Sequence, residues 1–121
     1  EMLEGDKNYG MEFVSSRGKE FFRGQVNTDI TAYITYGKID ITDDVMALEG
    51  LEVEWLRESG NIPSDNSWKP VYVDGRLNTL RITNDDMPIG WGTTIRMVTF
   101  VCRVFIPIGG KIQKVENYVN F

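Results

Sequence analysis

The amino-acid sequence predicts an all-β fold, an antiparallel β-sandwich of about seven strands. Three observations lead to this fold class. Short runs of residues alternate apolar and polar side chains at period two, turn-forming residues separate these runs at short and regular intervals, and no long segment has a helical period. We therefore expect one domain over residues 9–121, preceded by a polar leader or linker over residues 1–8.

The first part of the chain contains two clear candidate strands. Residues 9–15 and the run ITAYITY over residues 30–36 each place their apolar side chains on one face. The segment between them, SSRGKEFFRG (residues 15–24), contains two glycines and is predicted to be a turn-and-kink connector. Gly37 then turns the chain, and KIDITDD (residues 38–44) is expected to form a short strand that ends in acidic residues.

The middle of the chain favours strands over helices. VMALEG contains good helix formers, but Gly50 interrupts the run, and residues 51–57 then alternate in polarity as a strand does. Another alternating run covers residues 76–83. It is followed by NDDMPIGWG (residues 84–92), a cluster of turn-forming residues.

The last part holds the longest candidate strand, residues 93–108. Gly109 and Gly110 form a two-residue hairpin signal, after which KIQKVENYVNF is expected to pair back as the closing strand. The apolar faces of these strands predict a core. Its expected members are Trp55, Cys102, Phe100, Ile34, Ile82 and Val104.

Charge and composition exclude several classes of function. A formal net charge of −5 disfavours nucleic-acid phosphates and an anionic membrane as partners. No apolar run is long enough to span a bilayer, and no secretory leader is visible, so we expect neither membrane insertion nor a signal peptide. The chain has no histidine, which removes the commonest general base and metal ligand. We therefore expect no enzymatic activity, no catalytic residue, no cofactor and no metal.

Acidic residues gather near several predicted turns. Carboxylates that converge from different loops could bind Ca²⁺, but no stretch has the spacing of an EF-hand loop. Aspartates also build turns by bonding their own backbone, and we favour this interpretation. Glu52 and Glu54 share one face of a strand, as paired carboxylates of a glycosidase could, but alternating glutamates are also typical of a solvent-facing side. The acidic residues in question are Asp40, Asp43, Asp44, Asp65, Asp85 and Asp86.

Three aromatic residues outside the predicted core faces are candidates for ligand binding. Trp68 follows the polar loop GNIPSDNS, Trp91 lies in PIGWGT, and Tyr72 lies close to Trp68 in sequence. Aromatic rings on loops can stack on the apolar face of a sugar, and binding residues concentrate on loops held by a rigid scaffold. A tryptophan beside glycines can equally close one end of a sandwich. We favour the second interpretation for Trp68, as the plug of its loop.

The order of several short motifs resembles a known group of proteins. WLRESG (residues 55–60) is followed by DNSW (65–68), LRITNDD (80–86) and TFVCRV (99–104), and preceded by VSSRGKEFFRG (14–24) and GKIDITDD (37–44). This order is similar to that of immunoglobulin-like modules in tail-fibre, baseplate and minor structural proteins of tailed phages that infect Gram-positive bacteria. The resemblance covers roughly residues 9–106.

The resemblance implies an immunoglobulin-like sandwich and roles for individual residues. Trp55 would be the core tryptophan of strand C and Cys102 the strand F cysteine. The matching position of strand B lies near Ala32, so the inter-sheet disulfide of antibody domains is missing. Phe100 stands where antibody domains have the tyrosine of the tyrosine corner.

The resemblance also implies a function. It places the chain on the phage virion as a non-enzymatic spacer and surface-presented domain. Its partners would be other virion proteins or the rest of a larger parent chain, with weak binding of host cell-wall polysaccharide as an accessory role. The alternative is a dedicated carbohydrate-binding module that uses Trp68, Trp91 and Tyr72 as its platform.

Overall fold

The protein is a sandwich of two antiparallel β-sheets. The structure, a computed structural model, describes residues 8–18, 26–88, 90, 91, 95 and 97–121. The strands are β1 (Tyr9–Ser15), β2 (Asn27–Tyr36), β3 (Ile39–Asp40), β4 (Glu52–Glu58), β5 (Tyr72–Val73), β6 (Arg76–Thr83), β7 (Thr99–Ile108) and β8 (Lys111–Asn120). Three short helical segments connect them: α2 (Thr42–Met46), α3 (Ile62–Ser67) and the 3₁₀ turn η1 (Asn84–Asp86).

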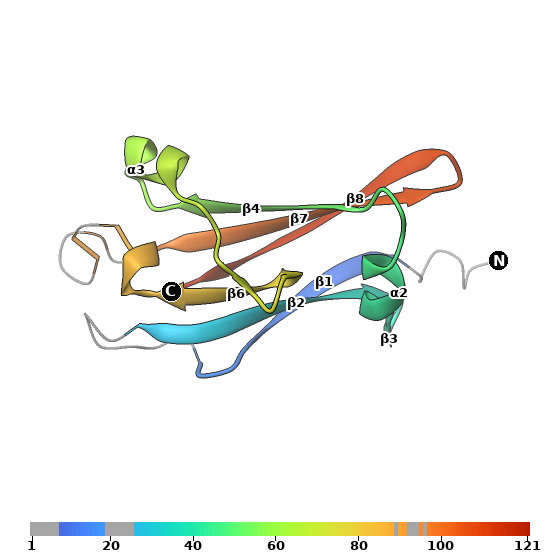
Figure 1. The fold of residues 1–121 in the computed structure, drawn as a ribbon, viewed down its shortest axis with the longest axis horizontal. Helices are drawn as coiled ribbons and strands as arrows, with labels where there is room; N and C mark the ends of the chain where they lie inside the picture. The colour runs from blue at the N-terminus through green and yellow to red at the C-terminus, as the bar shows by residue number, and fades with distance from the viewer. Residues whose placement is uncertain (1–7, 19–25, 89, 92–94, 96) are drawn as a thin grey trace.

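The order of the strands confirms the predicted fold class. One sheet has the order β1-β2-β6-β5, with β3 paired to β2, and the other has the order β4-β7-β8. With the strands lettered A to G along the chain and the two-residue β3 left out, these orders become ABED and CFG, the arrangement of an immunoglobulin-type sandwich. Figure 1 shows the two layers, with β4, β7 and β8 lying over β1, β2 and β6. The described residues form eight strands, because the two-residue β5 adds to the seven that the sequence predicts.

Alternation along the strands builds the core between the sheets. In β2, buried Ile30, Ala32 and Ile34 alternate with partly exposed residues. The registers place Trp55 of β4 opposite Cys102 of β7. The six residues predicted for the core all lie in it, each at most 4% exposed: Trp55, Cys102, Phe100, Ile34, Ile82 and Val104.

Trp55 occupies the centre of the sandwich and satisfies its polar group there. Its ring lies 6.0 Å from that of Phe13, and its indole N–H donates to the carbonyl of Leu77 at 2.8 Å. A buried indole N–H without an acceptor would cost about 1–3 kcal/mol, so this bond allows a tryptophan to serve as a core residue.

Local structure departs from the sequence prediction at several places. KIDITDD forms a strand only over Ile39–Asp40, because Thr42 then starts α2, with both its backbone N–H and its hydroxyl donating to the Asp40 carboxylate. The polar loop before Trp68 contains α3, with Asn61 as its N-cap and a proline in its first turn. The long run predicted from residue 93 is described as a strand only from Thr99.

Two predicted segments lie wholly or mostly outside the described residues. The leader over residues 1–8 is described only at its last residue, and the connector over residues 15–24 only through Gly18. None of the helices in the described part of the chain is long and apolar enough to cross a membrane.

Cys102 is expected to be unreactive in the folded protein. Burial raises the pKa of its thiol to about 12, so almost no thiolate, the reactive form, exists near neutral pH. Iodoacetamide at about pH 8 should therefore alkylate the folded protein at least tenfold more slowly than the urea-unfolded chain. Mass spectrometry of timed samples measures both rates, and equal rates would contradict the buried position.

Candidate functional site

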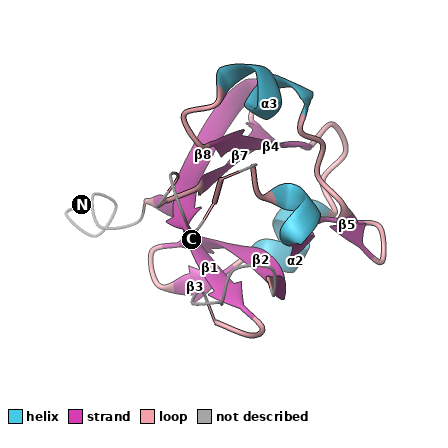
Figure 2. Ribbon diagram, turned by 90° about the vertical axis from the view of Figure 1, so that its left-hand side faces the viewer, coloured by secondary structure: helices cyan, strands magenta, loops and turns pink. Residues whose placement is uncertain are grey.

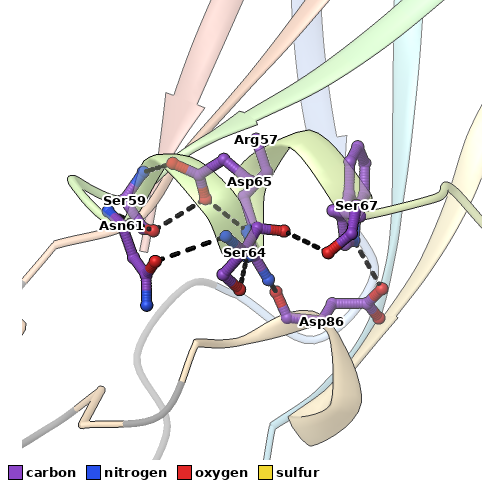
Figure 3. A network of polar contacts seen from close by, with 8 residues as sticks. Arg57, Ser59, Asn61, Ser64, Asp65, Ser67 and Asp86 are labelled. Atoms are coloured by element: carbon purple, nitrogen blue, oxygen red, sulfur yellow. Dashed lines mark hydrogen bonds and ion pairs between the residues drawn. The ribbon is translucent and has the colours of Figure 1, made fainter.

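The loop between β4 and β5 is organised by a buried arginine. Arg57 lies near the end of β4 on the inward face, and its side chain is only 3% exposed. Its Nε donates to Oδ1 of Asp65 at 2.8 Å, one terminal nitrogen donates to the carbonyl of Asp86 at 2.9 Å, and the other donates to the hydroxyl of Ser64. Figure 3 shows these groups converging from β4, α3 and η1. The guanidinium is thus bonded on three sides.

Asp65 of α3 is the charged partner of Arg57, and it also binds the turn that follows β4. Its carboxylate accepts from the backbone N–H of Ser59 at 2.9 Å and from the Ser59 hydroxyl at 2.7 Å. Burial opposes ionisation of this carboxyl, but the bonds from Ser59 and Arg57 outweigh it and hold its pKa below the ordinary value. The folded protein therefore favours the charged form of this carboxyl.

Trp68 joins the loop to the core and to the turn after β6. Its indole N–H donates to Oδ1 of Asp86 at 2.9 Å, and its ring lies 5.4 Å from that of buried Phe100. The second oxygen of Asp86 accepts from the backbone N–H of Thr83 at 2.8 Å, which completes a capping box at η1. Trp68 is therefore half-buried and committed to protein contacts through both its ring and its N–H.

We name the cluster formed by Arg57, Ser59, Ser64, Asp65, Trp68 and Asp86 the loop network. It ties the loop between the two sheets to the turn that leads from β6 toward β7. Each charged group in it has a specific protein partner. The loop network is suited to holding the end of the sandwich together.

Trp91 and Tyr72 are not members of the loop network, although both pack against the core. Tyr72 of β5 stands opposite Leu80, and burial, aided by the nearby Cys102, raises the pKa of its hydroxyl. Trp91 is half-buried, and within the described part of the chain its indole nitrogen is the buried side-chain polar atom that lacks a hydrogen-bond partner.

These three aromatic residues do not line a common cleft beside Trp68. A cleft of about 360 Å³ adjoins Trp68, but its walls come from β4 and α3, and neither Trp91 nor Tyr72 lines it. Of the three predicted binding residues, Trp68 lines this cleft, and it also has a structural contact.

The acidic residues singled out in the sequence bind different partners at separate places in the fold. Asp65 and Asp86 belong to the loop network, and Asp40 binds Thr42. Glu54 lies on the outer face of β4, where it pairs with Arg103 at 3.4 Å. Within the described residues, no three His, Cys, Asp or Glu side chains gather closely enough to hold a metal ion.

Sequence reasoning missed Arg57 and Ser59 as parts of one structural unit. A signal was present, since Arg57 follows Val53 and Trp55 on the inward face of the same strand. A charged residue at an inward position needs a partner, because an unpaired buried charge is costly. The inward position of Arg57 therefore predicts a nearby carboxylate, but the sequence does not identify which acidic residue supplies it.

Comparisons with protein-family models, with curated proteins and with solved structures find no match for this chain.

Replacing Trp68 with phenylalanine should lower the free energy of unfolding by about 1–3 kcal/mol. The phenyl ring can still pack on Phe100, but Asp86 loses the indole donor and is left with an unsatisfied oxygen. Urea unfolding followed by circular dichroism measures the loss. An unchanged free energy of unfolding would show that the indole bond does not stabilise the loop.

Lowering the pH should reduce the free energy of unfolding, because Asp65 becomes protonated. The pKa of Asp65 is lowered by folding, so its stabilising contribution is complete above the unfolded pKa near 3.8 and is lost as pH falls through the lower folded pKa. Urea unfolding from about pH 6 down to about pH 2 should therefore show a steeper loss for the natural protein than for Asp65→Asn. Equal slopes would contradict this assignment.

Proposed function

We propose that this chain is a non-enzymatic structural and interaction module of a phage virion, in the tail or baseplate region. It acts there as a spacer and as a surface-presented domain, with weak contact to host cell-surface glycans as a secondary role. Its partners are other virion proteins or the rest of a larger parent chain.

One observation carries the proposal. The motifs that resemble phage immunoglobulin-like modules are the motifs whose polar residues bind one another in the loop network. WLRESG contributes Arg57 and Ser59, DNSW contributes Asp65 and Trp68, and LRITNDD contributes Asp86. Residues that bind each other in this way maintain a fold, as a spacer module requires. The absence of histidine from the sequence points the same way.

Purified virions from the source of this gene test the structural role. Mass spectrometry of particles banded in a density gradient should detect peptides of this chain in proportion to known tail proteins, and immunogold labelling should mark the tail. A chain found only among the soluble proteins of the lysate would contradict the proposal. Major capsid peptides serve as the positive control in both fractions.

The adhesion role needs a separate experiment. A fluorescently labelled domain would be added to Gram-positive cells and to their purified wall polysaccharides. Saturable binding that is abolished by Trp68→Ala or Trp91→Ala, with the fold intact, would favour the alternative function, a dedicated carbohydrate-binding module. A spacer should instead give no dependence on these two tryptophans.

A further inference from the structure

The outer face of the five-stranded sheet carries a polar groove. None of the residues of the loop network lines it. A cleft of about 560 Å³ lies between β2, α2 and the turn joining β5 to β6, and a second cleft of about 440 Å³ lies between β1, β2 and the turn before β3. Both are lined by Tyr33 and Asp40, so they meet there and form one groove. Each volume falls in the range of about 300–1,000 Å³ that is typical of ligand sites. Figure 2 shows α2 and β5 on the same side of the sandwich.

Tyr33 forms the centre of this groove. It lies on β2 between buried Ala32 and Ile34, so its side chain belongs to the outward face of the sheet. Its hydroxyl makes no hydrogen bond with any other described residue. An aromatic ring with an unused hydroxyl offers both an apolar face and a polar edge to a ligand.

The groups around Tyr33 supply both a hydrogen-bond acceptor with negative charge and hydrogen-bond donors with positive charge. Asp40 uses one carboxylate oxygen for Thr42, at 2.9 Å to its N–H and 2.6 Å to its hydroxyl, and its other oxygen has no such bond. Hydrogen bonds from the Thr42 hydroxyl and backbone hold the pKa of Asp40 below its ordinary value. Arg76 lines the larger cleft and makes no ion pair with another described residue.

The charges in the groove favour a neutral ligand. The acids Glu12, Asp40 and Asp43 line it together with the bases Lys38 and Arg76, so neither a polyanion nor a polycation would find a field of one sign. A neutral sugar chain matches this lining, because each pyranose has an apolar C–H face for Tyr33 and hydroxyls that can donate to carboxylates or accept from Arg76 and Lys38. The groove is open to solvent along its length.

From this lining we propose that the outward face of β2, with Tyr33 as stacking platform and Asp40 and Arg76 as polar contacts, binds a neutral glycan chain. The inference rests on the adhesion part of the proposed function and places the binding site on β2 in place of the loop tryptophans. It makes the tryptophans structural, which agrees with the contacts of Trp68.

Titration followed by ¹⁵N-NMR tests the site on the intact chain. The probes are tetrasaccharides of glucose and of N-acetylglucosamine, and neutral fragments of Gram-positive wall polysaccharide, each added to roughly 10 mM because an open groove predicts weak affinity. Saturable shifts should cluster on β2, α2 and the β5–β6 turn. An unbranched polyuronate and a neutral tetrapeptide serve as comparison ligands.

Variants of Tyr33 and Arg76 make the test specific. Tyr33→Ala should weaken binding about tenfold, and Arg76→Gln should weaken it several-fold. The matched control is Tyr118→Ala, because Tyr118 is an exposed tyrosine, at 59%, on the outer face of the other sheet. Thermal unfolding of each variant checks the fold, and Tyr33→Thr, which suits a strand but lacks the ring, replaces Tyr33→Ala if that variant does not fold.

The outcomes separate this inference from the proposed function. No shifts with any neutral glycan, shifts only with the polyuronate or the tetrapeptide, or shifts centred on Trp68, Trp91 or Tyr118 would each overturn the groove as a glycan site. Binding at the tryptophans would leave an adhesion role intact while refuting the groove. Detection of the chain in virions would support the spacer role whatever the titrations give.

Discussion

Replacing Arg57 with leucine is expected to lower the free energy of unfolding by about 3–5 kcal/mol. The guanidinium is 3% exposed and bonded to Asp65, Asp86 and Ser64, so its removal leaves a carboxylate that is only 12% exposed without its counter-charge. Leucine fills part of the space, but it cannot satisfy the carbonyl of Asp86. The result should be a large loss of stability from one residue in a polar loop. Urea unfolding followed by tryptophan fluorescence measures it.

Arg103 is a matched control for this prediction. It also lies in the three-stranded sheet and pairs with two glutamates, Glu116 at 2.9 Å and Glu54 at 3.4 Å, but its side chain is 32% exposed on the outer face. Water screens these pairs, so Arg103→Leu should cost only about 0–1 kcal/mol. Equal losses for the two variants would refute the view that burial makes the Arg57 bridge important.

A double-mutant cycle identifies the partner of Arg57. The double variant Arg57→Leu, Asp65→Asn removes both charges, so it should be less destabilised than the sum of the single variants, with a coupling of about 1–3 kcal/mol. Purely additive losses would mean that Arg57 acts through its other partners alone. If Arg57→Leu fails to fold, Arg57→Lys provides the single variant, because it retains the charge but not the three-way bonding.

Replacing Phe100 with alanine should cost about 3–5 kcal/mol. Phe100 is fully buried, and its ring contacts those of Trp68, at 5.4 Å between centroids, and Phe121, at 5.7 Å. The cavity left by the substitution adjoins Trp68, so the variant should also loosen the loop network. Unfolding in urea measures the stability, and acrylamide quenching of tryptophan emission reports the loosening.

Phe105 on the same strand serves as the comparison. It lies on the outer face of β7 and is only partly buried. Phe105→Ala should therefore cost about 1 kcal/mol and leave tryptophan quenching unchanged. If Phe100→Ala destabilised the protein no more than Phe105→Ala, the inward assignment of Phe100 would be wrong.

The strands themselves could be predicted from sequence because their signal is local. Alternation at period two assigned the inward residues of β2 and β7 without knowledge of which strands pair. The hairpin between β7 and β8 was equally local. Gly109 and Gly110 both adopt positive φ, at 59° and 78°, which a two-residue turn between right-twisted strands requires and other residues resist.

The short helices were missed because their signals compete with turn signals. IPSDNS is composed of turn-forming residues, and only Asn61 as a cap and Pro63 near the helix start distinguish it from a loop. Six residues of helix are marginal alone, so α3 depends on contacts that the sequence does not display, chiefly Arg57 with Asp65 and Ser64.

The sequence by itself determined a β-sandwich with Trp55 and Phe100 in its core, since side-chain period and turn chemistry act over a few residues. Only the tertiary structure decided what Trp68 does and where Tyr33 lies. Trp68 donates a hydrogen bond to Asp86, 18 residues away in the sequence. Tyr33 and Arg76, from different strands, line the same cleft. Proximity between residues so far apart in sequence depends on strand order and register. These are set by the packing of the whole sandwich and not by any single segment.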